Sequence, residues 1–171
     1  MIIIYYIFLS LVSIYICYKL GDWENWIKYY PTILFFILSS VVCIVLTYDH
    51  PLWLYKPQIL NHTFTDLLIS ITVYPCTIMM FIPHLPKKLP KIILHISIYV
   101  AVYTIPELIA VKLGYFTYHN GWNIWYTIIF NYIMFPIIIL HYKKPLYAWL
   151  IALVSPHILF FLLKIPYNVI R

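Results

Sequence analysis

Charge is scarce in this chain of 171 residues: Asp, Glu, Lys and Arg make up only 9%, whereas hydrophobic residues make up 64%. A soluble domain carries about 25% charged residues. Because so few charges cannot cover a protein surface in water, the composition predicts that lipid is the solvent. Aromatic residues reach 20%, and Tyr and Trp favour the boundary between lipid and water.

Glycine and cysteine are scarce too. With only three Gly, the chain has neither a glycine-rich phosphate loop nor a G-x-S-x-G elbow, which argues against nucleotide binding by those motifs. The cysteines, Cys17, Cys43 and Cys76, lie in apolar runs, and their odd number favours packing over a disulfide framework or a metal-binding pair. The sequence predicts no metal site and identifies no cofactor.

Six apolar stretches approach the roughly 20 residues that a helix needs to cross a bilayer. They cover about 2–19, 31–48, 66–84, 92–112, 124–140 and 146–163. Since the connections are short, we expect a single domain over residues 1–171, an all-α, polytopic transmembrane helical bundle of about six spans. Residues 21–30, which mix Trp, Tyr and charge, are expected to lie on the membrane surface.

The net charge of +6 comes almost entirely from basic residues between these stretches. The first, third and fifth loops hold Lys19, Lys28, Lys87, Lys88, Lys91, Lys143 and Lys144, and the opposite side holds Lys56, Lys112, Lys164 and Arg171. The excess predicts that the odd loops face the cytoplasm and both termini face outside. Contact with anionic headgroups accounts for the charge, so we predict no nucleic-acid partner.

Polar residues follow the helical period inside several spans. In the fourth span, His95, Tyr99, Tyr103 and Glu107 recur every four residues and form one ridge. Glu107 lies roughly 9 Å inside the end of its span, at 1.5 Å per residue. A carboxylate at that depth is costly unless it is paired, solvated or protonated. Glu107 is therefore the candidate catalytic acid, and the alternative is a structural hydrogen bond or ion pair.

If there are six spans, the second and fourth loops lie on the same side of the membrane. They and the adjoining span ends carry a set of His, acids, amides and aromatic residues. The candidate ligand-binding residues in this set and on the facing ridges are Asp49, His50, Asn61, His62, Asp66, Tyr103, His119, Asn120, Trp122, Asn123 and Asn131. Such a face suits an amphiphilic ligand, a proton relay or, with less support from spacing, a divalent metal.

Several loop motifs point to a family. They are Lys28-Tyr29-Tyr30-Pro31, Thr47-Tyr48-Asp49-His50-Pro51-Leu52-Trp53, Asn61-His62-Thr63, Tyr74-Pro75-Cys76-Thr77, Pro83-His84, Tyr118-His119-Asn120-Gly121-Trp122-Asn123, Met134-Phe135-Pro136 and His141-Tyr142-Lys143-Lys144-Pro145. With these motifs the chain resembles an uncharacterised family of small multi-pass membrane proteins of spore-forming Gram-positive bacteria. The resemblance covers most of the chain and implies a bacterial membrane protein without implying an activity.

Pro106-Glu107 is also similar to part of the Pro-x-Glu-Glu-type motif of the membrane-embedded lycopene cyclases. The second acid of that motif is missing, since Leu108 follows Glu107. The likeness implies a proton donor for a carbon–carbon double bond, which a carboxylic acid kept neutral in an apolar site can supply.

Three functions follow. The leading hypothesis is a multi-pass protein of the cell membrane that binds a lipid-like ligand or a membrane partner at the face formed by the second and fourth loops. The second is an enzyme acting on an isoprenoid or lipid with Glu107 as acid. The third is a small proton-coupled transporter. An inverted repeat would favour the transporter, and a second acid beside Glu107 would favour the enzyme, but the sequence has neither feature.

Overall fold

In a computed structural model of the protein, residues 2–56 and 62–165 are described, and they form six helices and two short strands. The helices are α1 (Ile2–Leu20), α2 (Trp26–Leu46), α3 (His62–Phe81), α4 (Leu89–Lys112), α5 (Ile124–Lys143) and α6 (Pro145–Leu163). The helices from α2 to α6 are long and apolar enough to cross a membrane, and α1 is a shorter apolar helix. The prediction of an all-α helical bundle is confirmed.

Several boundaries differ from the prediction: the third span was expected over 66–84, but α3 covers His62–Phe81, and the largest difference is at the second span. The second span was expected to start at residue 31, after a stretch lying on the membrane surface, but α2 already begins at Trp26. Pro31 lies inside α2. Its missing N–H removes one bond to the carbonyl of the residue four earlier, which the first turns of a helix tolerate. Only Asp22, Trp23 and their neighbours up to Asn25 connect α1 to α2.

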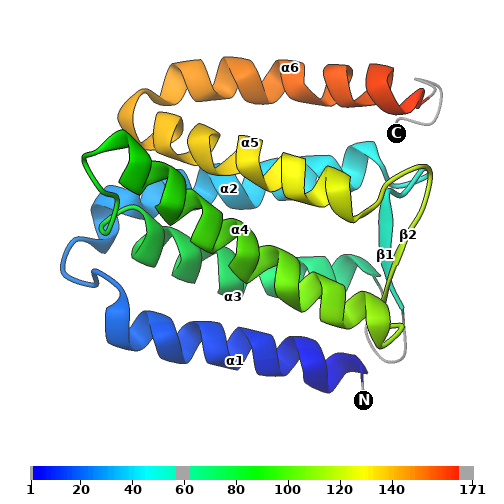
Figure 1. Ribbon diagram of the computed structural model, residues 1–171, viewed down its shortest axis with the longest axis horizontal. Helices are drawn as coiled ribbons and strands as arrows, with labels where there is room; N and C mark the ends of the chain where they lie inside the picture. The colour runs from blue at the N-terminus through cyan, green and yellow to red at the C-terminus, as the bar shows by residue number, and fades with distance from the viewer. Residues whose placement is uncertain (1, 57–61, 166–171) are drawn as a thin grey trace.

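The helices lie side by side, with α1 at one edge of the bundle and α6 at the other (Figure 1). α3 packs against α1 and α2, α5 packs against α2, α4 and α6, and aromatic side chains fill the middle. Phe81 of α3 and Phe135 of α5 are fully buried, with ring centroids 4.9 Å apart. The first, third and fifth loops share one end of the bundle, which we call the basic end because of its lysines.

At the other end, the second and fourth loops pair as a two-stranded antiparallel ribbon of β1 (Trp53–Tyr55) and β2 (Phe116–Tyr118) (Figure 1). Trp53 is opposite Tyr118, and Tyr55 is opposite Phe116. Because opposite and alternate residues share one face of a ribbon, these four aromatic residues lie on one face and Leu54 and Thr117 lie on the other. We call this the capped end.

Candidate functional site

Glu107, in the last third of α4, accepts two hydrogen bonds on the same oxygen. The Tyr118 hydroxyl lies 2.6 Å from Glu107 Oε1, and Thr127 Oγ1 of α5 lies 2.7 Å from it. The Trp122 indole N–H donates to Thr127 Oγ1 at 3.0 Å. Thr127 Oγ1 thus accepts from Trp122 and donates its single proton to Glu107, which is the final acceptor of this chain.

The second carboxyl of the capped end belongs to Asp66, which is buried in α3 with 5% of its surface exposed. It accepts a hydrogen bond from the Tyr55 phenol. Its Oδ2 lies 3.2 Å from His62 Nε2, one turn earlier, yet receives no bond of hydrogen-bonding geometry from the described residues. His62 Nδ1 in turn accepts the backbone N–H of Tyr55 at 3.4 Å. His62 thus lies between the ribbon and the acid.

The ribbon therefore brings one tyrosine to each intramembrane acid: Tyr55 of β1 to Asp66, and Tyr118 of β2 to Glu107. Burial raises the pKa of both phenols above the ordinary range, and the charge of the accepting carboxyl raises it further. Tyr55 lies in the electrostatic field of both Asp66 and Glu107. Because both phenols keep their protons, they are permanent donors to the two acids.

Three residues predicted as ligands hold the fourth loop in place. Asn123 is the N-cap of α5, and its side-chain oxygen accepts the N–H of Trp125 at 2.9 Å and that of Tyr126 at 3.4 Å. Asn120 donates to the Pro51 carbonyl at 2.7 Å, in a left-handed conformation with φ 50° that Asn tolerates. Trp122 is buried, with 6% of its surface exposed.

Other predicted residues lie apart from the two acids. Exposed His119 contacts Thr117 Oγ1 at 2.9 Å on the outer face of the ribbon. Tyr103 lies one turn deeper in α4, with its hydroxyl 2.8 Å from Thr77 Oγ1, and Asn131 is buried one turn below Thr127 in α5. Asp49 is exposed and His50 is half-buried in the loop before β1. Asn61 lies outside the described residues.

Tyr55, Tyr118 and Thr127 were not predicted as site residues, although they are the donors to the acids. Tyr118 and Thr127 were visible in the sequence as part of the fourth loop and of the α5 ridge. The signal that would have selected them is position: each lies within about one turn of the same membrane boundary as Glu107. Tyr55 gave no such signal, because only the pairing of β1 with β2 places it beside Asp66.

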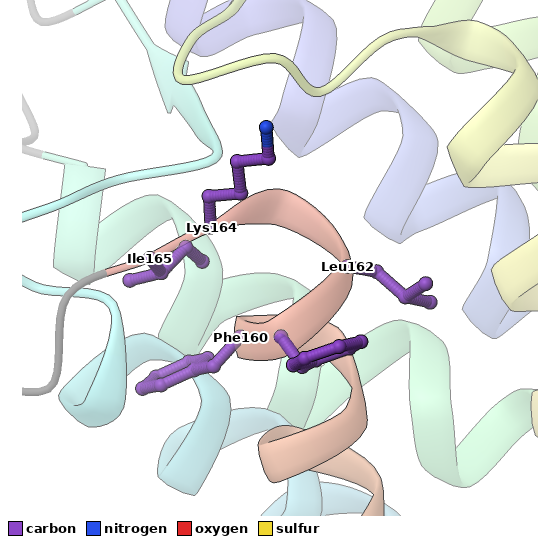
Figure 2. A pocket seen from close by; sticks show the side chains of 5 residues that line it. Phe160, Leu162, Lys164 and Ile165 are labelled. Atoms are coloured by element: carbon purple, nitrogen blue, oxygen red, sulfur yellow. The ribbon is translucent and has the colours of Figure 1, made fainter.

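A separate pocket of about 550 Å³ lies at the end of α6 and is shown in Figure 2. It is lined by Phe160, Phe161, Leu162, Lys164 and Ile165. The Lys164 side chain extends away from the Phe160 ring (Figure 2), and its backbone is left-handed with φ 54°. Ile165, with 3% of its surface exposed, packs with Leu52 and Trp122 and fixes this helix end. The lining comes from one segment and contains no acid or His.

In residues 2–56 and 62–165, no three His, Cys, Asp or Glu side chains are grouped so that they could hold a metal ion. The chemistry available at the capped end is therefore that of hydrogen-bonded carboxyls among aromatic rings. No family model, no curated protein and no solved structure matches this chain.

Proposed function

We propose that the chain is a multi-pass integral protein of the cell membrane that binds an amphiphilic, lipid-like ligand at its capped end. The observation that carries the proposal is the pair of intramembrane acids, Glu107 and Asp66, each tied by a tyrosine to an extramembrane ribbon. Acids inside a bilayer are expensive and are usually retained for a task. Two of them at one end of the bundle, each contacted by one strand of the same ribbon, favour a shared task.

The free acceptor atoms indicate the chemistry of the ligand. Among the described residues, the hydrogen bonds to Glu107 reach only Oε1, and Asp66 Oδ2 receives none. Carboxylate oxygens accept hydrogen bonds and attract cations. The aromatic face of the ribbon adds the half-buried ring of Trp53, whose face also attracts cations. We therefore expect a headgroup that donates hydrogen bonds or carries positive charge, with its apolar tail along the helices.

The distribution of lysines supports an orientation for this site. The basic end carries the lysines of the first, third and fifth loops, so the positive-inside tendency assigns it to the cytoplasm. The capped end then faces outside, where the headgroups of the outer leaflet lie at the level of the ribbon.

The experiment is native mass spectrometry of gently extracted protein, with elemental analysis of the same sample. Wild-type protein is expected to carry a stoichiometric amphiphile that Glu107→Gln and Asp66→Asn both lose. Glu24→Gln, which changes an exposed acid in the first loop at the basic end, is the matched control and should keep it. Bare wild-type protein, or an amphiphile retained by both capped-end variants, would contradict the proposal.

Two further outcomes of the same experiment would show that the capped end binds something other than a lipid-like ligand. A membrane protein that co-purifies with wild type and is lost in His119→Ala would make the capped end a partner surface. A stoichiometric metal would direct attention to His50, His62 and His119 instead.

A second candidate function is an enzyme that protonates a carbon–carbon double bond of an isoprenoid with Glu107. The anchoring of Glu107 Oε1 by Tyr118 and Thr127 favours it, because a fixed carboxyl with its other oxygen free can present a proton in one direction. Glu107→Gln should then abolish turnover of a polyene while Glu24→Gln keeps it. Unchanged product formation by Glu107→Gln would eliminate this role.

A further inference from the structure

Polar side chains form a ridge on the inward face of α3. Asp66, Ser70, Tyr74 and Thr77 recur at helical spacing, so they follow one another along this helix. Asp66 has 5% of its surface exposed, Ser70 none and Thr77 3%. Because α3 runs from the capped end to the basic end (Figure 1), the ridge leads from the ribbon into the middle of the bundle.

Hydroxyl groups from α2 and α4 join this ridge. Ser70 Oγ donates to Ser40 Oγ of α2 at 3.5 Å, and Ser40 Oγ lies 3.4 Å from the Tyr74 hydroxyl. The rings of Tyr74 and of Tyr103 in α4 are stacked with centroids 6.4 Å apart, and the Tyr103 hydroxyl lies 2.8 Å from Thr77 Oγ1. We call these five residues from three helices the hydroxyl file.

A histidine lies beyond each end of the hydroxyl file, and a backbone group sets its tautomer. His62 Nδ1 accepts the N–H of Tyr55, so the proton of the neutral ring is on Nε2, 3.2 Å from Asp66 Oδ2. Toward the basic end, His95 Nε2 lies 3.0 Å from the Phe81 carbonyl oxygen. Because a carbonyl only accepts, Nε2 of His95 carries a proton, and Nδ1 is left to accept another.

We propose that the hydroxyl file carries protons across the membrane between Asp66 at the capped end and His95 at the basic end. Each hydroxyl accepts a proton on its oxygen and passes its own proton to the next oxygen. One proton taken up at one end therefore releases one at the other, and no side chain is altered. Contacts of 3.4 and 3.5 Å exceed the usual O–H···O distance of about 2.7–2.8 Å, so these hydroxyls can turn and reset the file.

The remaining steps of the path each cover one turn of a helix. Asp66 and Ser70 are one turn apart on α3, and Tyr103, Tyr99 and His95 follow one another at the same spacing on α4. The rings of Tyr99 and His95 have centroids 5.1 Å apart. Side chains one turn apart have Cβ atoms about 5–6 Å from each other, a gap that a side-chain rotation or one transient water molecule closes.

Helix packing alone does not account for these polar groups. Hydroxyls that hold membrane helices together do so by satisfying one another. Yet Asp66 Oδ2 and the buried hydroxyl oxygens of Ser39 and Thr104, which lie next to the file in sequence, have no hydrogen-bond partner among the described residues. Unsatisfied polar atoms inside a bilayer are costly, and groups that exchange protons need such spare donors and acceptors.

The test measures proton flux through the full chain in phosphatidylcholine vesicles that contain a trapped pH-sensitive dye. A potassium gradient with valinomycin makes the inside negative and draws protons inward. Wild-type vesicles are expected to acidify faster than protein-free vesicles. Asp66→Asn, Ser40→Ala and Tyr103→Phe are each expected to lower the rate to that of protein-free vesicles, because each removes one member of the path.

Matched controls remove the same chemical groups outside the file. Tyr132 of α5 donates to Ser97 Oγ of α4 at 2.9 Å, and neither residue contributes to the path. Ser97→Ala and Tyr132→Phe should therefore keep the wild-type rate. Ser40→Thr retains a hydroxyl and should keep the flux that Ser40→Ala loses. Circular dichroism checks that every variant stays helical.

Three results would overturn the proposal: wild type no faster than protein-free vesicles, flux retained by both Ser40→Ala and Tyr103→Phe, or a wild-type leak that carries sodium equally well, which would indicate a water-filled pore. The inference does not depend on a lipid-like ligand. Ser40→Ala and Tyr103→Phe leave both acids of the capped end in place, so their proton flux and their bound amphiphile are separate readouts.

Discussion

At each end of the bundle a tyrosine donates a hydrogen bond to an acid, but the two ends differ in which of the partners belongs to a helix. At the basic end, the acid is Asp22 in a loop, and the buried Tyr29 of α2 donates to it at 2.6 Å. At the capped end, the acid is Glu107 within a helix, and Tyr118 donates to it from a strand outside the helices, also at 2.6 Å. In the first case the tyrosine is in the helix and the acid is outside, whereas in the second the roles are exchanged.

The difference shows why only one end has a ribbon. A carboxylate in a loop is solvated, so for Asp22 the hydrogen bonds from Tyr29 and from the nearby Asn25 amide are sufficient. A carboxyl inside the bundle has no water to satisfy it, so its donors come from the protein. For Glu107 these are Thr127 of α5 and Tyr118 of the ribbon. The two-stranded ribbon is thus the structural consequence of placing Asp66 and Glu107 within helices.

Among the variants that test this comparison, Trp122→Ala is expected to cause the largest loss of stability. Trp122 fills the cluster under the ribbon and orients Thr127, so its removal leaves a cavity and a hydroxyl without its donor. We expect a loss of about 3–5 kcal/mol in the free energy of unfolding, measured by titrating the protein in mixed micelles with a denaturing detergent. Trp125→Ala, which removes a Trp side chain with 71% of its surface exposed, is the control. Equal losses in both variants would contradict the packing role.

A smaller effect is expected from Tyr118→Phe, which removes one of the two donors to Glu107. Leaving this half-buried acceptor with one donor fewer should cost about 1–3 kcal/mol, measured by the same titration. In a double-mutant cycle with Glu107→Gln, the two losses should fall short of additivity by at least about 0.5 kcal/mol. Additive losses would mean that Tyr118 and Glu107 do not act on each other.

Helix capping provides the third test. Asn123→Ala removes the side-chain acceptor for the first N–H groups of α5 and should cost about 1 kcal/mol. Asn123→Asp keeps an acceptor at the N-cap and should restore most of that stability. If the Asp variant is as unstable as the Ala variant, capping is not what Asn123 contributes.

Alkaline titration tests the two tyrosines of the ribbon. The pKa of Tyr55 and of Tyr118 is raised above the ordinary value of 10.0 by burial and by the nearby carboxyls. Above pH 10, the unfolded chain therefore loses protons that the folded chain keeps, so stability should fall as the pH rises. The slope should be shallower in Tyr55→Phe and Tyr118→Phe, measured by thermal unfolding between pH 9 and about 11. A wild-type slope in both variants would contradict this.

The smallest effect is expected at the basic end. Hydrogen bonds from Tyr29 and then from Asn25 lower the pKa of Asp22 below 3.8. Its contribution to stability is present above that value and disappears as the pH falls through the lowered pKa. Asp22→Asn should slightly flatten the acid limb of the unfolding curve, measured by thermal unfolding at acidic pH. An acid limb in Asp22→Asn that is as steep as in the wild type would contradict the role of these hydrogen bonds.

The sequence predicted the helices well, because an apolar run of about 20 residues has few alternatives in lipid. It also placed Glu107, Asp66 and Trp122 at one end of the bundle. It could not predict the ribbon, because β1 and β2 have three residues each and lie 63 residues apart at Leu54 and its partner Thr117. Nor could it assign Asn123 to capping with certainty, although an Asn before an apolar run is the usual sign of a helix start.

The order of residues in the chain has a consequence for biosynthesis. Glu107 is made before either of its donors: Tyr118 follows 11 residues later and Thr127 follows 20 residues later. At a synthesis rate of about 5–20 residues per second, the acid waits roughly 1–4 s for Thr127. During that interval α4 carries an unsatisfied carboxyl and no ribbon. We therefore expect α4 to wait at the translocation machinery until α5 emerges, so that the two helices enter the bilayer as one hairpin.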